Sequence, residues 1–201
     1  MNGFKNRQGL RLRDNAVQRR CHSAPLAAGQ AILLVASFVL GMMSLAQAAP
    51  ARIVAIGASN THGWYIGKQG AYPAQLQALL KARGIDAQVT NAGVPFETTG
   101  MMRQRLDAEV PDGTDLVILQ PGANDLRFFG SREKRAENIA AMTERLRARS
   151  IPVIVYDEVI PDRYYTFDFI HLTREGHAMI AMKLLPLVIG KLGLRQIPPR
   201  P

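Results

Sequence analysis

The chain has 201 residues, of which 47% are hydrophobic, and it carries a formal net charge of +9. This length fits one domain, and this hydrophobic share is that of a soluble globular protein, which argues against both a disordered tail and a pure membrane protein. The single cysteine, Cys21, excludes an intrachain disulfide and a cysteine-based zinc site.

The positive charge is concentrated at the N-terminus. Residues 1–48 hold six basic side chains and one acidic side chain, so they supply +5 of the +9. The arginine-rich stretch 132–149 interleaves its arginines with glutamates, as a solvated amphipathic helix does. We therefore expect no nucleic-acid partner for the folded domain.

Residues 1–48 have the three parts of an export signal. A basic stretch runs to Arg20, an apolar core spans Ala31–Leu45, and Ala46-Gln47-Ala48 supplies a small-x-small cleavage site. We predict cleavage after Ala48 and a periplasmic or secreted location for the domain that follows.

The apolar core of the leader leaves one alternative open. Its dense part has 15 residues, fewer than the roughly 20 needed to span a bilayer. Counted back to Leu26 it has 20, so an uncleaved inner-membrane anchor is the alternative. In both cases the domain covers residues 49–195, with a loose tail at 196–201.

Short apolar runs alternate with amphipathic stretches through the domain, which is typical of an α/β fold with a parallel sheet. The apolar runs predict strands, in chain order, over 52–56, 87–91, 116–119 and 153–156. The amphipathic stretches predict helices over 72–83, 99–109, 132–149 and 174–189, the last capped by Thr173. In that last helix we expect Leu187 on the buried side and His177 on the exposed side.

Polar, glycine-containing loops follow the first three predicted strands. Their sequences are Gly57-Ala-Ser-Asn-Thr-His-Gly63, Asn91-Ala-Gly-Val-Pro-Phe-Glu97 and Gln120-Pro-Gly-Ala-Asn-Asp125. Ligand sites in open α/β sheets lie outside the carboxyl ends of the strands. The three loops are therefore expected to share one rim.

Ser59 is the candidate nucleophile of this rim. It directly follows a buried strand, where a strand-to-helix turn exposes a hydroxyl. The Gly-x-Ser-x-Gly elbow is not matched, because Thr61 stands where the second glycine belongs. A serine that only caps the next helix is the alternative interpretation.

His171 is the candidate base, with Asp168 three residues before it. A turn at this spacing can bring the carboxylate onto one ring nitrogen and leave the other facing the serine. The order serine, aspartate, histidine matches one known triad order. His62 is too near Ser59 in sequence to face it easily. The alternative is an acid that caps a helix beside a surface histidine.

Asn124 follows the third strand, where its amide could donate a hydrogen bond to a substrate oxygen near Ser59. The alternative is that Asn124 and Asp125 simply close a turn.

Together these loops resemble the SGNH, or GDSL-type, serine hydrolases over nearly all of residues 52–190. The resemblance is carried by four blocks, Gly57-Ala58-Ser59, Asn91-Ala92-Gly93, Gly122-Ala123-Asn124-Asp125 and Asp168-Phe169-Ile170-His171. It implies a flavodoxin-like three-layer α/β/α sandwich with a parallel sheet. It also implies Ser59 as nucleophile and backbone oxyanion donor, His171 as base, Asp168 as its orienter, and Asn124 as a side-chain donor. The other polar and glycine residues of these blocks support the site: Gly57, Asn91, Gly93, Gly122 and Asp125.

Two positions depart from the family pattern. Ala58 stands where the family usually has an aspartate, which the triad does not use, so we expect altered packing and retained chemistry. Phe96 stands where the family has a glycine whose backbone N–H donates to the oxyanion. Phe96 keeps that N–H, but its side chain restricts the backbone and narrows the site. We expect it to be both oxyanion donor and pocket wall.

The sequence thus predicts an exported serine hydrolase that cleaves small carboxylic esters or thioesters, lipids among them, through an acyl-enzyme on Ser59, with no metal or organic cofactor. Aromatic residues beside the rim suggest a pocket for an apolar acyl or aryl group, formed by Trp64, Tyr65, Phe128 and Phe129. The alternatives are a deacetylase of envelope polysaccharide and a non-catalytic ligand-binding module on the same fold.

Overall fold

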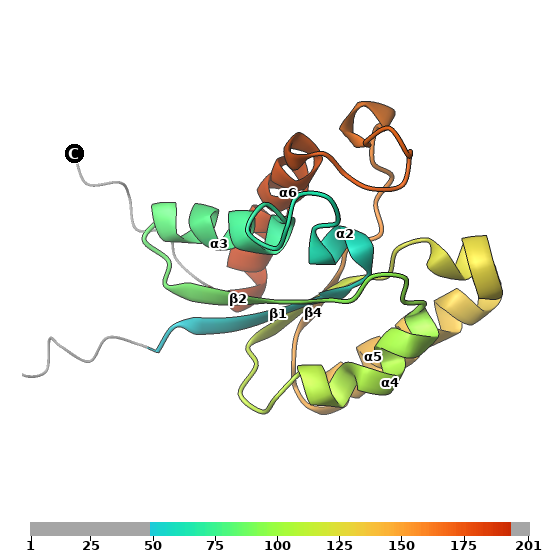
Figure 1. Cartoon of the computed structure of the whole chain (residues 1–201). Helices are drawn as coiled ribbons and strands as arrows, with labels where there is room; N and C mark the ends of the chain where they lie inside the picture. The colour runs from blue at the N-terminus through green and yellow to red at the C-terminus, as the bar shows by residue number, and fades with distance from the viewer. Residues whose placement is uncertain (1–48, 194–201) are drawn as a thin grey trace, which may run out of the picture. The chain divides into compact units, whose positions relative to one another are not determined.

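The computed structural model describes residues 49–193 (Figure 1). The predicted export signal at 1–48 and the predicted tail at 196–201 lie outside the described residues, as do the side chains of Phe128 and Phe129. Within 49–193, no helix is both long enough and apolar enough to cross a membrane.

Four parallel strands form a single sheet in the order β2-β1-β3-β4. Their bounds are Ala51–Gly57 for β1, Ala87–Gly93 for β2, Leu116–Gln120 for β3 and Val153–Val155 for β4. The chain steps from β1 to one edge and then returns to the other side of β1 as β3. The topological switch point, where such folds bind ligands, therefore lies between the carboxyl ends of β1 and β3.

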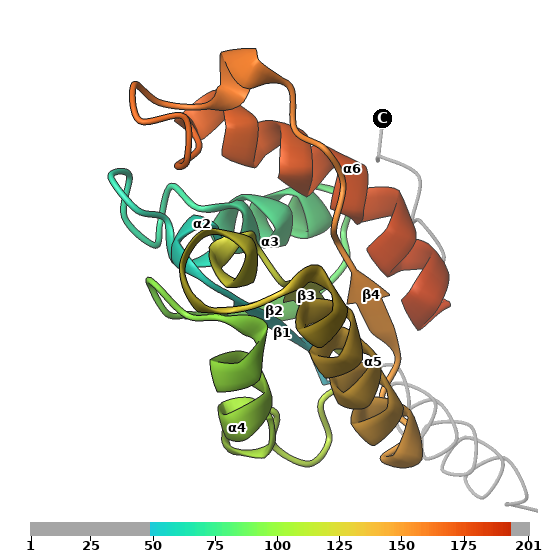
Figure 2. The same ribbon diagram turned by 90° about the vertical axis from the view of Figure 1, so that its right-hand side faces the viewer.

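Helices cover both faces of the sheet, which confirms the predicted three-layer α/β/α fold. Helices α3 and α6 lie together on one face, and α4 and α5 on the other (Figure 1, Figure 2). Their bounds are Tyr72–Ala82 for α3, Thr99–Glu109 for α4, Arg132–Ala148 for α5 and Arg174–Leu192 for α6. Shorter helical segments connect them: α2 at Ser59–His62, η1 at Asp125–Phe129 and η2 at Asp162–Tyr164.

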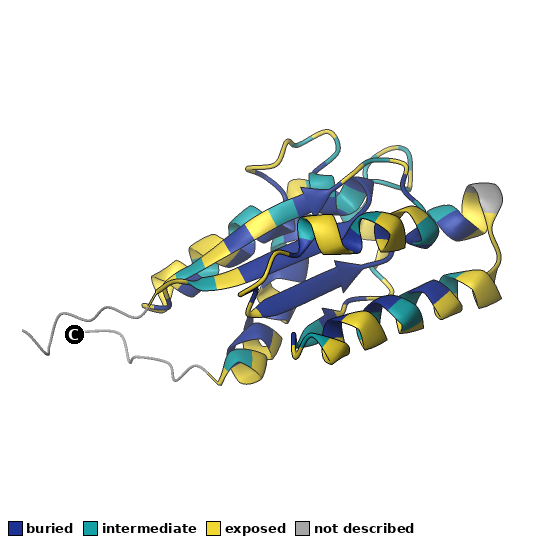
Figure 3. Cartoon of the chain, turned by 90° about the horizontal axis from the view of Figure 1, so that it is seen from below, coloured by how far each residue is buried: buried dark blue, intermediate teal, exposed yellow. Residues whose placement is uncertain are grey.

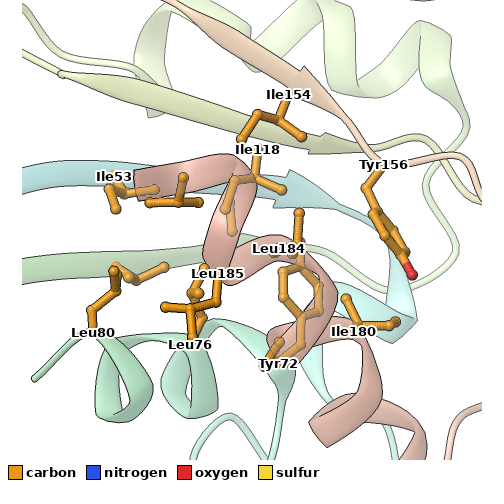
Figure 4. Packing of buried hydrophobic residues seen from close by; sticks show 14 of the residues in the cluster. Ile53, Tyr72, Leu76, Leu80, Ile118, Ile154, Tyr156, Ile180, Leu184 and Leu185 are labelled. Carbon is orange, nitrogen blue, oxygen red and sulfur yellow. The ribbon is translucent and has the colours of Figure 1, made fainter. Parts of the chain in front are cut away.

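The strands bury both faces, so they build two cores. In β1, Ile53 and Ala55 point into the core under α3 and α6, whereas Val54 and Ile56 point into the core under α4 and α5. Every residue of β3 is buried, and the helices turn exposed residues outward, away from the sheet (Figure 3). Figure 4 shows side chains of α3 and α6 packed against strand side chains in the first of these cores.

Most predicted element bounds agree with the structure to within a few residues, and two predictions on the last helix are wrong. Leu187 is 46% exposed instead of buried, and His177 is fully buried instead of exposed. The buried face of α6 is broader than the single apolar stripe predicted, because the start of α3 covers the first turn of α6.

His177 is buried because it completes the N-terminus of α3. Tyr72 is the first residue of α3, and the residue before it, Ala71, has no side chain that could cap the helix. The Tyr72 N–H instead donates to His177 Nδ1 at 3.1 Å, and the two rings stack with centroids 6.5 Å apart. Burial, together with the nearby charge of Arg174, lowers the pKa of His177 to about 4.

This burial predicts a loss of stability in mild acid. Folded His177 stays neutral down to about pH 4, whereas the unfolded residue takes a proton near its ordinary pKa of 6.5, so the unfolded chain binds more protons between these values. The free energy of unfolding is therefore highest above pH 6.5. It falls by on the order of 3 kcal/mol as the pH drops to about 4. Urea unfolding across this pH range measures it, and His177→Gln should remove that part of the slope. Equal slopes in both proteins would contradict the assignment.

Candidate active site

Ser59 lies at the switch point, where β1 ends and α2 begins. Its side chain is nearly buried and lines a cleft of about 310 Å³ together with Gly122 and Asn124 from the loop after β3. Two of the three predicted rim loops therefore meet at one cleft.

Two glycines allow α2 to pack directly on the ends of β1 and β2. A Cβ atom at Gly57 would lie 2.0 Å from Thr61 Oγ1, and one at Gly93 would lie 2.2 Å from the backbone nitrogen of His62. Any side chain at either position would push α2, and Ser59 with it, away from the sheet. His62 Nδ1 lies 3.2 Å from the Gly93 carbonyl oxygen, which adds to the same contact.

His171 and Asp168 are in direct contact, with Nδ1 of the ring 2.5 Å from Oδ2 of the carboxylate. The other carboxylate oxygen accepts from the Thr166 hydroxyl at 2.8 Å and from the N–H groups of Ile170 and His171 at 2.9 Å. Desolvation raises the pKa of Asp168, but these hydrogen bonds outweigh it and hold that pKa well below its usual range. An ionised carboxylate keeps the proton on Nδ1, so Nε2 is left as the acceptor.

Asn60 joins the nucleophile segment to the histidine segment. Its Nδ2 donates to the Ile170 carbonyl at 3.0 Å, and its Oδ1 accepts from the Leu172 N–H at 3.0 Å. The residue next to Ser59 thus grips the chain on both sides of His171, about 110 positions later. No hydrogen bond between the Ser59 hydroxyl and the His171 ring is found in residues 49–193. Such bonds are often long in free enzymes and tighten when substrate binds.

Aromatic side chains surround the His171 ring. Trp64 stacks on it with ring centroids 5.4 Å apart, and Tyr65 meets it edge-on at 5.3 Å. Phe96 packs against Trp64 at 5.3 Å, and Phe167 against Tyr65 at 5.6 Å. We call Trp64, Tyr65, Phe96 and Phe167 the aromatic rim. Three of its members, all but Trp64, are more than half exposed, so the rim presents apolar surface beside the imidazole.

Phe96 adopts the backbone conformation that glycine favours. Its φ is +66°, in the left-handed region that costs a non-glycine residue about 1–2 kcal/mol. Tyr65 and Phe169 also have positive φ, at +67° and +54°. These three residues lie in loops of the site, where loop contacts hold the strain in place, and Ser150 after α5 is the other non-glycine residue of 49–193 with a positive φ.

A partly buried ion pair ties the loops together. Arg105 pairs with Glu97 at 2.6 Å and donates to the carbonyl oxygens of Ala92 at 2.8 Å and Gly57 at 3.3 Å. The Glu97 carbonyl in turn accepts from Asn124 Nδ2 at 2.8 Å. The ends of β1 and β2, the loop with Phe96 and the loop with Asn124 are therefore connected through one guanidinium.

The remaining predicted supporting residues hold the same loops. Asn91 Oδ1 accepts from the Gly93 N–H at 3.0 Å. Buried Asp125 accepts from the N–H and the hydroxyl of Thr99, at 2.9 and 2.6 Å, at the start of α4. Gly122 has a φ of +64°, and its carbonyl accepts from Arg135.

The arrangement offers a serine, an imidazole with an ionised partner and a side-chain amide at one rim. Within the described part of the chain, no three His, Cys, Asp or Glu side chains are grouped to hold a metal ion. Sequence reasoning missed Asn60 and Arg105. Asn60 stands beside Ser59 in a polar loop, which is a weak signal, and the site-loop partners of Arg105 lie 8 to 48 positions before it.

Residues 55–166 match the model of the GDSL-like lipase/acylhydrolase family, which covers more than half of the chain. The chain belongs to this family. The chain is 27% identical over 138 residues to an arylesterase of Vibrio mimicus, and the match covers 66% of this chain and 67% of that protein. It is equally similar over 137 residues to the esterase TesA of Pseudomonas aeruginosa, covering 67% of each.

A solved structure supports the GDSL-like fold. The crystal structure of TesA superposes with a TM-score of 0.64 at 18% identity, covering 70% of this chain and 99% of that one. The family and its esterase relatives establish that the chain is a hydrolase of ester bonds.

Proposed function

We propose that this protein is an exported serine esterase that cleaves small esters or thioesters through an acyl-enzyme on Ser59. His171 acts as the base and Asp168 orients it. The observation that carries the proposal is the pair of Asn60 hydrogen bonds, since they tie the residue after the candidate nucleophile to both neighbours of His171, whose ring contacts the ionised Asp168 carboxylate.

The chemistry follows from these groups. Ser59 Oγ attacks the ester carbonyl carbon while His171 Nε2 takes the hydroxyl proton, and the C=O electrons move onto the oxygen. The tetrahedral intermediate collapses, the bond to the alcohol or thiol breaks, and the imidazolium returns the proton to the leaving group. Water then attacks the acyl-enzyme by the same route, which releases the acid and restores Ser59.

Three donors are proposed for the developing oxyanion: the N–H groups of Ser59 and Phe96, and the amide of Asn124. One N–H of Asn124 Nδ2 donates to the Glu97 carbonyl, which fixes the amide and leaves its second N–H to donate. Phe96 supplies its N–H from the backbone conformation of a glycine. Losing one donor of this kind typically costs about 10²–10³-fold in turnover.

The aromatic rim favours a substrate with an aryl or apolar acyl group. It lies against the His171 ring, so a bound ester would place one half on the rings of Trp64, Tyr65 and Phe96. The similarity to an arylesterase agrees with this choice. A polysaccharide deacetylase is the competing outcome, in which acetylated xylan would be turned over faster than aryl acetates.

Activity-based labelling tests the nucleophile. We expect a fluorophosphonate to label the folded protein once, at Ser59, and Ser59→Ala to abolish both labelling and aryl acetate hydrolysis while leaving the melting temperature nearly unchanged. Ser150→Ala, which removes an exposed serine hydroxyl after the end of α5, serves as the matched control and should still be labelled. Labelling that survives Ser59→Ala would overturn the proposal.

Phe96 provides a test that separates its backbone from its ring. Phe96→Gly keeps the N–H and relieves the positive φ, but it removes the contact with Trp64. We expect kcat/KM for aryl esters to fall about tenfold, in line with about 1.4 kcal/mol of lost apolar contact, while ethyl acetate hydrolysis changes much less. Phe96→Ala keeps the strain, so it should be less stable than Phe96→Gly. An equal loss for both esters would argue against the wall role.

Export is proposed from the leader of residues 1–48. Mass spectrometry of the N-terminus of protein recovered from the periplasm or the medium of an expressing bacterium should find Ala49 as the first residue. An intact leader in the membrane fraction would instead support the anchor.

A further inference from the structure

The cleft beside Ser59 has walls of its own, distinct from the aromatic rim. Its walls come from the loop after β3, the start of α5 and the segment 156–160 after β4, and no member of the aromatic rim lines it. At about 310 Å³ it is large enough for a small ligand group. One half of an ester bound at Ser59 can therefore lie in this cleft.

The charged side chains on the cleft wall leave a positive excess. Asp157 is neutralised by Arg135, and Glu158 by Lys183. Arg127 and Arg132 also line the cleft, and neither forms an ion pair with a carboxylate of residues 49–193. Two cations are thus available in the wall of the cleft that Ser59 also lines.

A buried hydroxyl without a partner lies in the same wall. Tyr156 is 3% exposed, and its hydroxyl has no hydrogen-bond partner among the described residues. In Figure 4 this hydroxyl points away from β4, towards the segment that follows β1. A buried polar group is normally hydrogen-bonded, so an unpartnered one lining a cleft indicates a ligand that completes it.

We propose that this cleft is an anion subsite, which holds a carboxylate or phosphate group carried by one half of the ester substrate. Arg127 and Arg132 supply the positive charge, and the Tyr156 hydroxyl donates a hydrogen bond. The proposal rests on Ser59 as the nucleophile, and it defines the substrate as an ester with an aryl or apolar part at one end and a negative charge at the other.

The protonation of Tyr156 fits a donor role. Burial, and to a smaller extent the negative charge of Glu158, raise the pKa of Tyr156 to about 12. The hydroxyl therefore keeps its proton at neutral pH and can donate to an anion. Hydrogen bonds to charged groups are stronger than those between neutral groups, so the subsite should discriminate clearly between an anion and a neutral isostere.

Matched ester pairs test the subsite. The wild-type protein is assayed with a phenyl hemisuccinate against its methyl ester, and with an acetylated glycerol phosphate against the acetylated glycerol. We expect kcat/KM to favour at least one anionic member by about tenfold or more, with the carboxylate and phosphate pairs showing which anion is preferred. A neutral preference in both pairs would overturn the proposal.

Variants locate the discrimination. Arg127→Gln combined with Arg132→Gln, and separately Tyr156→Phe, should each reduce the anionic-to-neutral ratio, the double variant most strongly. Arg147→Gln removes an exposed arginine at the other end of α5 and is the matched control, which should keep the wild-type ratio. Unchanged ratios in the cleft variants would overturn the assignment even if the wild type prefers anions.

A binding measurement separates this proposal from the proposed function. Phenyl phosphate should raise the melting temperature of the wild type and of Ser59→Ala, but not of the arginine double variant. Stabilisation without fluorophosphonate labelling would reject the esterase mechanism and keep the subsite. Labelling with no stabilisation and no anion preference would reject the subsite alone.

Discussion

One asparagine holds the two halves of the site together. Asn60 uses both ends of its amide, as a donor to the Ile170 carbonyl and as an acceptor from the Leu172 N–H. An aspartate at neutral pH could only accept, and a leucine could do neither, so the pairing needs an amide. Because the next residue back is Ser59, the position of the imidazole relative to the nucleophile depends on these two hydrogen bonds.

Arg105 plays the corresponding part for the proposed oxyanion donors. Its charge is largely removed from water, and the cost of that desolvation is offset by the Glu97 carboxylate and two backbone carbonyls. The same contacts fix the loop of Phe96 and, through the Glu97 carbonyl, the amide of Asn124. The strained backbone conformation of Phe96 can persist because these contacts hold the next residue, Glu97, firmly in place.

The sequence allows the layers and the site loops to be predicted, because hydrophobic periodicity and glycine positions are local signals. Helix α4 has the predicted bounds, and the Asp168 and His171 side chains meet as a three-residue spacing suggests. Contacts between segments that are distant in the chain cannot be predicted from these local signals. His177 looked exposed because nothing in its own helix shows that the start of α3 lacks a cap, and Tyr156 looked like the end of a strand when it forms part of a cleft wall.

The Asp168–His171 pair is not part of the sheet or of any long helix. It lies on the segment between β4 and α6, which is held by the ion pairs of Asp157 and Glu158, the Asn60 bonds, one bridge from Tyr165 to Leu172, and aromatic contacts. Segments with few buried contacts open at a lower free energy than the core beneath them. Gentle warming should therefore abolish activity reversibly while the strands and their covering helices are still folded. The temperature range over which the enzyme is active is then set by the segment between β4 and α6 and not by the melting of the whole domain.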